Sequence, residues 1–468
     1  MSKSNFCLVT LLATALTGCV AYQPKDLNPA ATQAQLERRS LRDDGLQKFV
    51  AAHGQPASAE AWDLARLTLA AFYFSPELDV ARAQLAEAVA GVRTAQARPN
   101  PTFAFTPGYN QDSVAGVTPW ILDYALDFPI ELAGKRGHRT AEAQQQAEAA
   151  RLEVARIAWS ARAAVRRALS ELHAAEATAE LWRGQKPLLA QAAQLVDFQV
   201  KAGEVSPLEA AQARIALSRA ELAARESERA VAQARSRLAE AIGVPLAALT
   251  EVALSYRGLD EPAAPLDPIE ARRWAAQNRA DLLAALATYA ASQAALQGEI
   301  ARQYPDLSFG PGYQLDQGEG KWSLALGVTL PVFHQNQGPI AAAQARREVA
   351  AARFLALQNR VLAEVDRAAA DYTSALGDLT AVNAMRTNLE QQAKTIRAQQ
   401  AAGETSRLEL TRAQIELADH ARAELAARLR VEQALGAVED AVQRPLAWPE
   451  SAWRSSPRAA SLPRNAAN

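Results

Sequence analysis

The sequence predicts a mainly α-helical fold with a small β part, built from two structural repeats that each combine a β-hairpin with a long coiled-coil helical hairpin. Three observations predict it. Apolar residues make up 49% of the chain but aromatic residues only 6%, a composition that favours long helices packed side by side. Sequence landmarks recur in the same order in the two halves. Short stretches that alternate apolar and polar residues indicate strands.

The first residues, MSKSNFCLVTLLATALTGCV, have the pattern of an export signal, with Lys3 in a polar lead and an apolar stretch too short to span a bilayer. The ending Leu16 to Cys19 resembles the bacterial lipoprotein signal, in which cleavage leaves the cysteine as the lipid-bearing N-terminus. Val20 follows Cys19 in place of the aspartate that retains lipoproteins at the inner membrane, which points to the outer membrane. The alternative is a plain secretory signal with a chance cysteine. Cys7 is lost with the signal, so the mature chain is expected to contain no disulfide.

Four landmarks define the repeats. FSPEL at Phe74 recurs in pattern as NRADL at Asn278, NPTFAFTPGY at Asn100 as YPDLSFGPGY at Tyr304, YALDFPI at Tyr124 as LGVTLPV at Leu326, and AGEVSPLEAAQARIAL at Ala202 as AGETSRLELTRAQIEL at Ala402. The predicted organisation is a signal peptide (1–18), an N-terminal periplasmic segment (19–58), repeat 1 (59–248), an inter-repeat linker (249–267), repeat 2 (268–450) and a disordered tail (451–468).

Each repeat is expected to begin with a helix, over about 59–97 and 268–303. A strand pair follows, then a very long helix over about 136–202 or 339–402, a turn centred on Gly203 or Gly403, and a second helix. Leucines spaced seven apart, such as Leu181, Leu188 and Leu195, are typical of a coiled-coil seam. A helix of roughly 65 residues is about 100 Å long, which suits a rod or tunnel rather than a compact domain.

The strands are predicted at about 101–110, 118–130, 305–316 and 321–332, joined by loops at 111–117 and 316–320. Side chains alternate across a strand, so one face of each strand is apolar and aromatic. In the second strand the apolar face carries Trp120, Leu122, Tyr124, Leu126 and Phe128. The other face carries Asp123 and Asp127. Pro129 is expected to end this strand, and Gly134 to permit the turn into the long helix.

The apolar face has two interpretations. It could be the inside of a soluble sandwich, or it could face lipid in an outer-membrane barrel with the polar face, including Asp123 and Asp127, toward a water-filled lumen. Each repeat offers no second sheet to pack against, which favours the barrel. Four strands cannot close a barrel alone, so the chain is expected to oligomerise. Two copies give eight strands and a filled interior, and three give twelve and a pore.

The chain resembles the TolC-like outer-membrane factor family, and within it the CzcC-like lipoprotein branch that serves efflux. The most specific segments are LPVFHQNQGPIAAAQA (Leu330–Ala345), PIELAGKRGHR (Pro129–Arg139) and the two AGExS turns. The resemblance implies a homotrimer with a twelve-stranded outer-membrane β-barrel, embedded in lipid and continuous with a periplasmic α-helical tunnel. It further implies an exit duct for an inner-membrane pump of the resistance-nodulation-division type, joined to it by a periplasmic adaptor, or membrane fusion protein. Metal ions or small toxic compounds are the expected exports.

The resemblance also assigns roles at the helical tips. The tip motif, where the adaptor docks in this family, maps onto Gly203, Ser206, Leu208, Gly403, Ser406 and Leu408. Acidic residues after the tip can form a cation-selective ring, and Glu409 and its counterpart Glu209 occupy the first such position. Arg412 stands where a second acidic residue can occur, so a Glu/Arg pairing that latches neighbouring helices is expected in place of a simple acidic ring. Turn formation alone and an ordinary solvated helix face are the alternatives.

Nothing in the sequence predicts an enzyme. The five histidines have no metal-ligand spacing, no cofactor motif occurs, and a net charge of −1 offers no basic surface to a nucleic acid. We therefore expect no cofactor, no metal site and no nucleic-acid partner. Two other functions remain open, a channel for type I protein secretion and a periplasmic coiled-coil lipoprotein without a pore.

Overall fold

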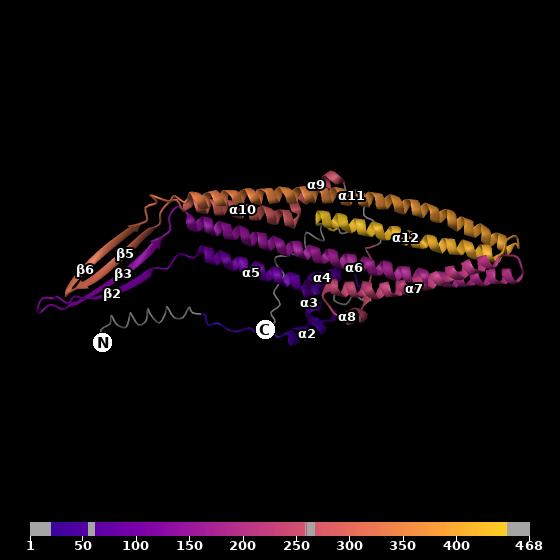
Figure 1. Ribbon diagram of the computed structural model, residues 1–468, viewed down its shortest axis with the longest axis horizontal. Coiled ribbons are helices and arrows are strands. Elements are labelled where there is room, and N and C mark those ends of the chain that lie inside the picture. The colour runs from indigo at the N-terminus through magenta and orange to yellow at the C-terminus, as the bar shows by residue number, and fades with distance from the viewer. Residues whose placement is uncertain (1–19, 55–60, 258, 260–266, 447–468) are drawn as a thin grey trace.

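The computed structural model describes residues 20–54, 61–257, 259 and 267–446. These residues form a rod with a β-sheet at one end and two helical tips at the other (Figure 1). The two longest helices, α6 (Lys135–Lys201) and α11 (Gln337–Ala401), contain 67 and 65 residues and run from the sheet to the tips. Each is about 100 Å long. They return through α7 (Pro207–Ile242) and α12 (Arg407–Val442).

The helix expected first in each repeat is two helices. Residues 59–97 contain a short strand, β1 (Ala61–Trp62), and then α4 (Leu64–Phe74) and α5 (Pro76–Gln96). The break occurs because Ser75 is extended, accepts a hydrogen bond from the Leu78 amide and precedes a proline at the first helical position.

The second repeat divides in the same place. Its first helix is α9 (Pro268–Asn278) followed by α10 (Ala280–Ala301). Here the extended residue is Arg279, whose guanidinium is held by Asp281 at 2.7 Å, Glu364 at 3.0 Å and the Ala441 carbonyl at 2.9 Å. These contacts fix the change of direction against α11 and α12.

The four long strands form one antiparallel sheet in the order β2-β3-β5-β6, comprising β2 (Thr102–Tyr109), β3 (Trp120–Ile130), β5 (Leu307–Asp316) and β6 (Glu319–Val328). The loop predicted at 316–320 is a two-residue turn. Gln317 and Gly318 both have positive φ, 51° and 98°, the combination that suits a tight hairpin. Strand β6 therefore begins earlier than predicted. It ends at Val328 rather than Val332 because its partner β5 begins at Leu307, which pairs with Val328.

Pro129 does not end β3, contrary to the sequence prediction. It lies within the strand opposite Ser308, beyond the last pairing with β2, where β3 has a neighbour on one side only and the missing amide proton is tolerated. Gly134, with φ of 71°, makes the turn into α6. Its counterpart before α11 is Asn336, with φ of 62°.

A small compact region lies beside the middle of the rod, next to α6 and α7 (Figure 1). It contains α2 (Pro29–Glu37), α3 (Asp44–Ala52), α8 (Leu246–Thr250) and β4 (Ala253–Leu254), which pairs in parallel with β1. The start of the predicted linker at 249–267 is therefore structured, since Leu249 and Leu259 are buried in the same apolar core as α3, α4, α6 and α7. A second core joins α9, α11 and α12.

Among the described residues, none of the helices combines the length and hydropathy needed to cross a membrane. The predicted tail at 451–468 and the signal peptide at 1–18 lie outside the described residues.

Candidate functional site

The sheet has one apolar face, which no other part of the described chain covers. Strand pairing aligns Phe105, Tyr124, Tyr313 and Trp322 in a row across all four strands. Neighbouring ring centroids in this row are 5.0, 6.5 and 4.9 Å apart. Tyr313 is half-buried, whereas the other three side chains are exposed, Trp322 at 82%; Phe103 on the same face is 62% exposed. An apolar surface of this extent marks contact with lipid or with another protein.

The opposite face is polar and lined by small side chains. Its rows include Thr106, Asp123, Gln314 and Lys321 in one register, and Thr102 beside Asp127 in another. The Lys321 ammonium lies 2.6 Å from Asp316. In the part of the chain that the structure describes, neither Asp123 nor Asp127 forms an ion pair. The register thus places both aspartates on the face opposite the aromatic row.

The two outer strands, β2 and β6, each pair on one side only within the described chain. An exposed strand edge of eight to ten residues presents unpaired amide and carbonyl groups, which favours pairing with another chain. The sheet therefore provides the elements of a larger closed sheet, with an apolar outside and a polar inside.

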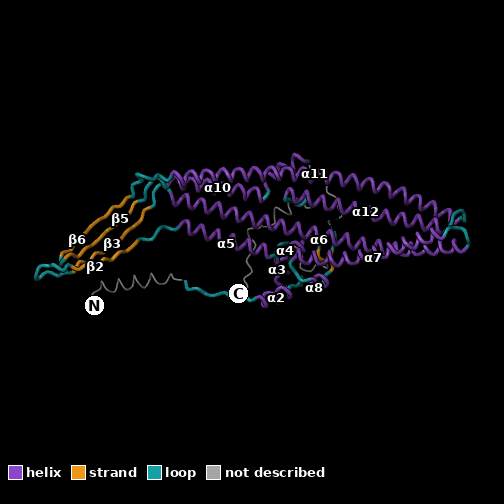
Figure 2. The backbone as a smooth tube through the Cα atoms, in the orientation of Figure 1, coloured by secondary structure: helices purple, strands orange, loops and turns teal. Residues whose placement is uncertain are grey.

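The passage from strand to helix is held by ion pairs. The Lys135 ammonium lies 2.7 Å from Asp306, and Arg139 binds Glu131 at 2.7 Å while donating to the Ala95 carbonyl at 2.9 Å. A polar cavity of about 600 Å³ lies beside these contacts. Figure 2 shows the loops that these pairs fix, between the orange strands and the purple helices. The pairs hold the sheet and the helical bundle in a defined relative position.

The helical tips have the same backbone in both repeats. Gly203 and Gly403 have φ of 74° and 76°, and the following amides, Glu204 and Glu404, donate to the carbonyls of Gln199 and Gln399. This is a glycine-terminated helix end that a residue with a side chain would strain. Ser206 and Ser406 both occupy the cap position of the returning helix. Only the Ser406 hydroxyl caps, accepting from the Glu409 amide at 3.2 Å.

The two leucines that the sequence treats as equivalent have different surroundings. Leu208 is 67% exposed, whereas Leu408 is 6% exposed and packs against Ala192, Val196 and Ala210 of the first hairpin. The second hairpin thus uses its tip leucine to contact the first. Leu208 is the one whose side chain is accessible.

The three charged residues near the tips are all exposed. Glu209 lies in the first turn of α7. Arg412 lies 3.5 Å from Glu409 in its own helix, one turn away, with both side chains about half exposed. Within one chain, Arg412 and Glu409 therefore form an ion pair along α12, and a latch between neighbouring helices of an assembly stays a prediction.

A buried ionic cluster that the sequence analysis did not single out joins the two repeats. Arg162 and Arg166 of α6 lie 2.9 and 3.2 Å from the Glu439 carboxylate of α12, and Trp159 donates to Asp440 at 3.1 Å. Burial lowers the pKa of Arg166 despite the nearby carboxylates, and burial raises the pKa of Asp440 despite the nearby arginines. The four-residue spacing of the arginines on one helix face, beside Val165 and Leu169, is the signal that could have identified them.

Nearer the tips, a second polar contact joins the same two helices. The Gln185 amide donates to Asp419 at 2.8 Å, and Arg422 binds both side chains while stacking 3.9 Å over Trp182. Among the described residues there is no group of side chains able to hold a metal ion.

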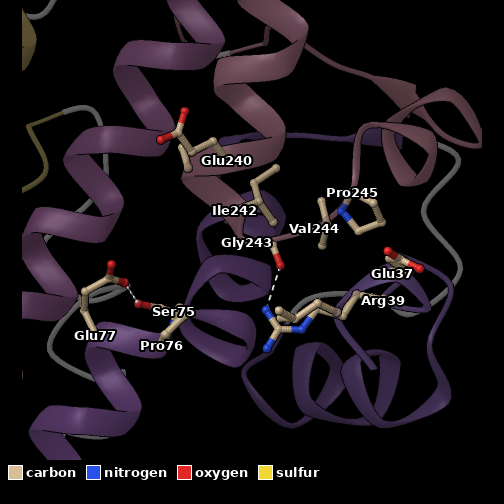
Figure 3. A pocket seen from close by; sticks show the side chains of 12 residues that line it. Glu37, Arg39, Ser75, Pro76, Glu77, Glu240, Ile242, Gly243, Val244 and Pro245 are labelled. Carbon is tan, nitrogen blue, oxygen red and sulfur yellow. Dashed lines mark hydrogen bonds between the residues drawn. The ribbon is translucent and has the colours of Figure 1, made fainter. Parts of the chain in front are cut away.

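Another cavity, of about 390 Å³, lies where the chain enters the compact central region (Figure 3). Its wall includes the end of α2, the start of α5, the end of α7 and the side chain of Arg39. The guanidinium donates to the carbonyls of Phe74 at 3.0 Å and Gly243 at 2.8 Å. This contact connects the N-terminal segment to the two helix ends and was also missed from the sequence.

The chain is similar to a metal resistance protein and to outer-membrane channels of known structure. The cobalt-zinc-cadmium resistance protein CzcC of Cupriavidus metallidurans is 28% identical over 286 residues, which is 61% of this chain and 66% of CzcC. The match thus spans slightly less than two thirds of that relative. The outer-membrane channel OprN superposes with a TM-score of 0.68 at 20% identity, over 92% of this chain and 99% of OprN. CusC, studied for transmembrane channel formation, gives a TM-score of 0.66 at 18% identity, over 82% of this chain and 92% of CusC. At these identities the two structures establish the shared fold.

The profile of the outer membrane efflux protein family matches residues 70–244 and 272–442. The two matched ranges correspond to the two halves of the rod, each with its strand pair and long helical hairpin. The chain belongs to the outer membrane efflux protein family.

Proposed function

We propose that the chain is the outer-membrane exit duct of a tripartite efflux system of the resistance-nodulation-division type. Three copies would pair their free strand edges into a twelve-stranded barrel, with the helical rods forming a tunnel into the periplasm. The observation that carries this proposal is the four-stranded sheet, with an exposed aromatic face, a polar opposite face and two unpaired edges, at the end of helices about 100 Å long.

Purification from outer membranes tests the assembly. We expect heat-resistant trimers that require detergent for extraction and that conduct ions in planar bilayers. A monomer released from the periplasm without detergent, with no conductance, would instead support the coiled-coil lipoprotein without a pore.

We further propose that Cys19 is the lipidated N-terminus, bearing palmitate among its acyl chains. The support is the sequence from Leu16 to Cys19 with Val20 after it. Metabolic labelling with palmitate should mark the mature protein, and Cys19→Ala should abolish the label.

The exported compounds are proposed to be metal cations or small toxic compounds. CzcC, the relative at 28% identity, is a cobalt-zinc-cadmium resistance protein. Deleting the gene for this protein should therefore lower the concentration of these metals that the host cell tolerates. Unchanged metal tolerance together with loss of a secreted protein would favour type I protein secretion instead.

The tips are the proposed docking place for the periplasmic adaptor. Gly203 and Gly403 set the turns, Ser206 and Ser406 begin the returning helices, and Leu208 offers the exposed apolar contact. Leu408 would act indirectly, by holding the second tip against the first. Glu209, Glu409 and Arg412 are candidates for the gate, and Asp123 and Asp127 for the barrel lumen.

A further inference from the structure

The long helices and strands form a single layer with two open sides. At the sheet end the strand order is β2-β3-β5-β6. Next to the sheet α5 packs on α6, α6 on α10 and α10 on α11, and in the tip half α7 packs on α6, α6 on α12 and α12 on α11 (Figure 1). Strand β2 and helices α5 and α7 therefore lie along one side of the layer, the first-repeat side. Strand β6 and helix α11 lie along the other, the second-repeat side.

In the tip half, the two repeats meet inside one chain through polar and charged side chains. Arg422 of α12 binds Gln185 and Asp419 and stacks 3.9 Å over Trp182 of α6. The Gln185 amide also donates to Asp419 at 2.8 Å. This contact lies in the middle of the layer, between α6 and α12.

The equivalent positions on the open sides carry apolar side chains. Counted from the two tip glycines, Leu222 of α7 corresponds to Arg422, and Met385 of α11 corresponds to Gln185. Leu222 is 60% exposed and Met385 is 55% exposed, so the described chain leaves both uncovered. They lie on opposite sides of the layer and cannot meet within one chain. A second copy that repeats the contact between the repeats brings Leu222 of one chain onto Met385 of the other.

The passage from strand to helix shows the same exchange of a charged side chain for an apolar one. In the first repeat, Glu131 lines the polar cavity together with Ala295 and Gly298 of α10. Its counterpart after β6, two residues beyond the equivalent proline, is Phe333. The Phe333 side chain is fully exposed. An exposed aromatic side chain of this kind marks a contact surface.

The first-repeat side offers a matching surface at the same level of the rod. Gly91 and Thr94 of α5 occupy the positions equivalent to Ala295 and Gly298 of α10. Both are exposed, and no other described atom lies within 4 Å of the position that a Gly91 Cβ would take. A second copy that continues the layer places Phe333 over this surface.

We propose that neighbouring copies repeat the packing of the two repeats, with apolar side chains replacing charged ones at two levels of the rod. The Met385 and Phe333 side of one copy packs on the Leu222 and Gly91 side of the next. Such a head-to-tail contact closes into a ring when the rotation allows it. This inference rests on the proposed assembly into a trimer.

The difference in chemistry keeps folding separate from assembly. If Leu222 took the place of Arg422 beside α6, Gln185 and Asp419 would lose their charged partner, which costs free energy at a half-buried site. The charged contact therefore favours pairing of the repeats within one chain. The apolar contact is left for the next copy.

Cross-linking in outer membranes tests both contacts. Leu222→Cys with Met385→Cys, and Gly91→Cys with Phe333→Cys, should each be linked by a short bis-maleimide into covalent trimers. The control is Gly91→Cys with Ile300→Cys. Ile300 is 41% exposed but belongs to α10, which has a neighbouring helix on both sides, so this pair should give no trimer.

Truncation of Phe333 measures its contribution to assembly. Phe333→Ala should lower the yield of heat-resistant trimers about tenfold, because truncating an interface anchor costs more than 1 kcal/mol of binding free energy. Phe333→Leu keeps an apolar side chain and should retain most of the yield. Ile300→Ala should retain all of it. Since Phe333 is exposed in the single chain, each variant should keep the wild-type helix content in circular dichroism.

A fluorescent label on Phe333→Cys distinguishes a neighbouring copy from lipid. Brominated lipids quench a label that touches acyl chains, so we expect no quenching in trimers. Strong quenching, or trimers in which neither designed pair is linked, would overturn the proposal and leave the exit duct standing. The exit duct fails on a different result, when the unmodified chain gives neither trimers nor conductance.

Discussion

At the scale of single residues, Glu439 shows how a buried charge is accommodated between the repeats. Its side chain is 3% exposed and accepts from both Arg162 and Arg166, while the Leu446 amide donates to it at 2.7 Å. Removing one member of such a group leaves the remaining charges desolvated and unpaired. Glu439 therefore forms the direct ion pairs with both arginines, while Asp440 and Glu432 also lie near Arg166.

Glu439→Gln should lower the free energy of unfolding by about 3–5 kcal/mol, since two buried guanidinium groups lose the carboxylate that they bind directly. Thermal unfolding of the detergent-solubilised protein, followed by circular dichroism, measures the change. The matched control is Glu153→Gln, which removes the exposed pair with Arg156 and should cost at most about 1 kcal/mol. Equal losses of stability from the two substitutions would show that the buried cluster contributes no more to stability than an exposed ion pair does.

Arg412→Glu tests the proposed gate. It replaces an attractive pair with two carboxylates one turn apart on α12, a repulsion on the order of 0.5 kcal/mol for each chain. We expect higher conductance in planar bilayers and greater entry of large antibiotics that the outer membrane normally excludes. Arg430→Glu, which reverses a charge on the same helix far from the tip, is the control. If Arg412→Glu has the conductance and antibiotic entry of the wild-type protein, Arg412 is not part of the gate.

At the scale of elements, the sequence predicted the four strands, the two long helices and the glycine turns because each has a local signal. Alternation marks β3, heptad leucines mark α6, and Gly203 marks a helix end. The breaks at Ser75 and Arg279 were missed. Ser75 breaks the helix through a local cap, whereas the turn at Arg279 is held by Glu364 and the Ala441 carbonyl, which are distant in sequence.

In the candidate site, too, the sequence predicted the features that have a local signal and missed those that depend on distant contacts. Alternation alone separates Asp123 and Asp127 from the aromatic face, and the repeat alone identifies the paired tips. The pairing partners of Arg162 and the attachment made by Arg39 depend on how distant segments pack. The difference between Leu208 and Leu408 likewise arises only when one hairpin lies against the other.

That difference gives a matched pair of substitutions. Leu408→Ala should cost about 2–4 kcal/mol of stability because it leaves a cavity between the hairpins. Leu208→Ala should change stability by no more than about 0.5 kcal/mol, yet weaken binding of the periplasmic adaptor. Unfolding curves and adaptor pull-down with each variant provide the two measurements. The docking role of Leu208 is refuted if its variant binds the adaptor normally.

The polar face of the sheet leads to a prediction about ion preference. If Asp123 and Asp127 line the lumen, three copies of each attract cations. The double substitution Asp123→Asn with Asp127→Asn should move the reversal potential in a salt gradient toward zero. Thr106→Asn, a change on the same face without a change in charge, should not. A reversal potential unaltered by the double substitution would place the aspartates outside the conduction path.

At the scale of the whole molecule, the sheet is incomplete without other copies. Strands β2 and β6 lie at opposite edges, so they cannot meet within one chain. Their residues Ala104 and Ala325 lie in the half of each edge strand nearer the helices, on the polar face. Pairing between copies brings such positions close together.

Ala104→Cys combined with Ala325→Cys should therefore be linked by a short bis-maleimide into covalent trimers in outer membranes. Gel electrophoresis under denaturing conditions detects the product. Each single cysteine variant serves as a control and should remain monomeric on the gel. Linkage only to dimers, or none at all, would contradict closure by three copies.

Because α6 and α11 have nearly the same length, only certain insertions can lengthen the rod in proteins that evolve from this one. One inserted residue in either helix rotates every later side chain by about 100° and shifts the tip by about 1.5 Å relative to its partner. Seven residues inserted into both helices, with seven more in each of α7 and α12, lengthen the rod by about 10 Å. Each helix then still turns nearly the same side chains toward its neighbours. Adaptation to a wider periplasm therefore requires coordinated insertions in both halves of the gene.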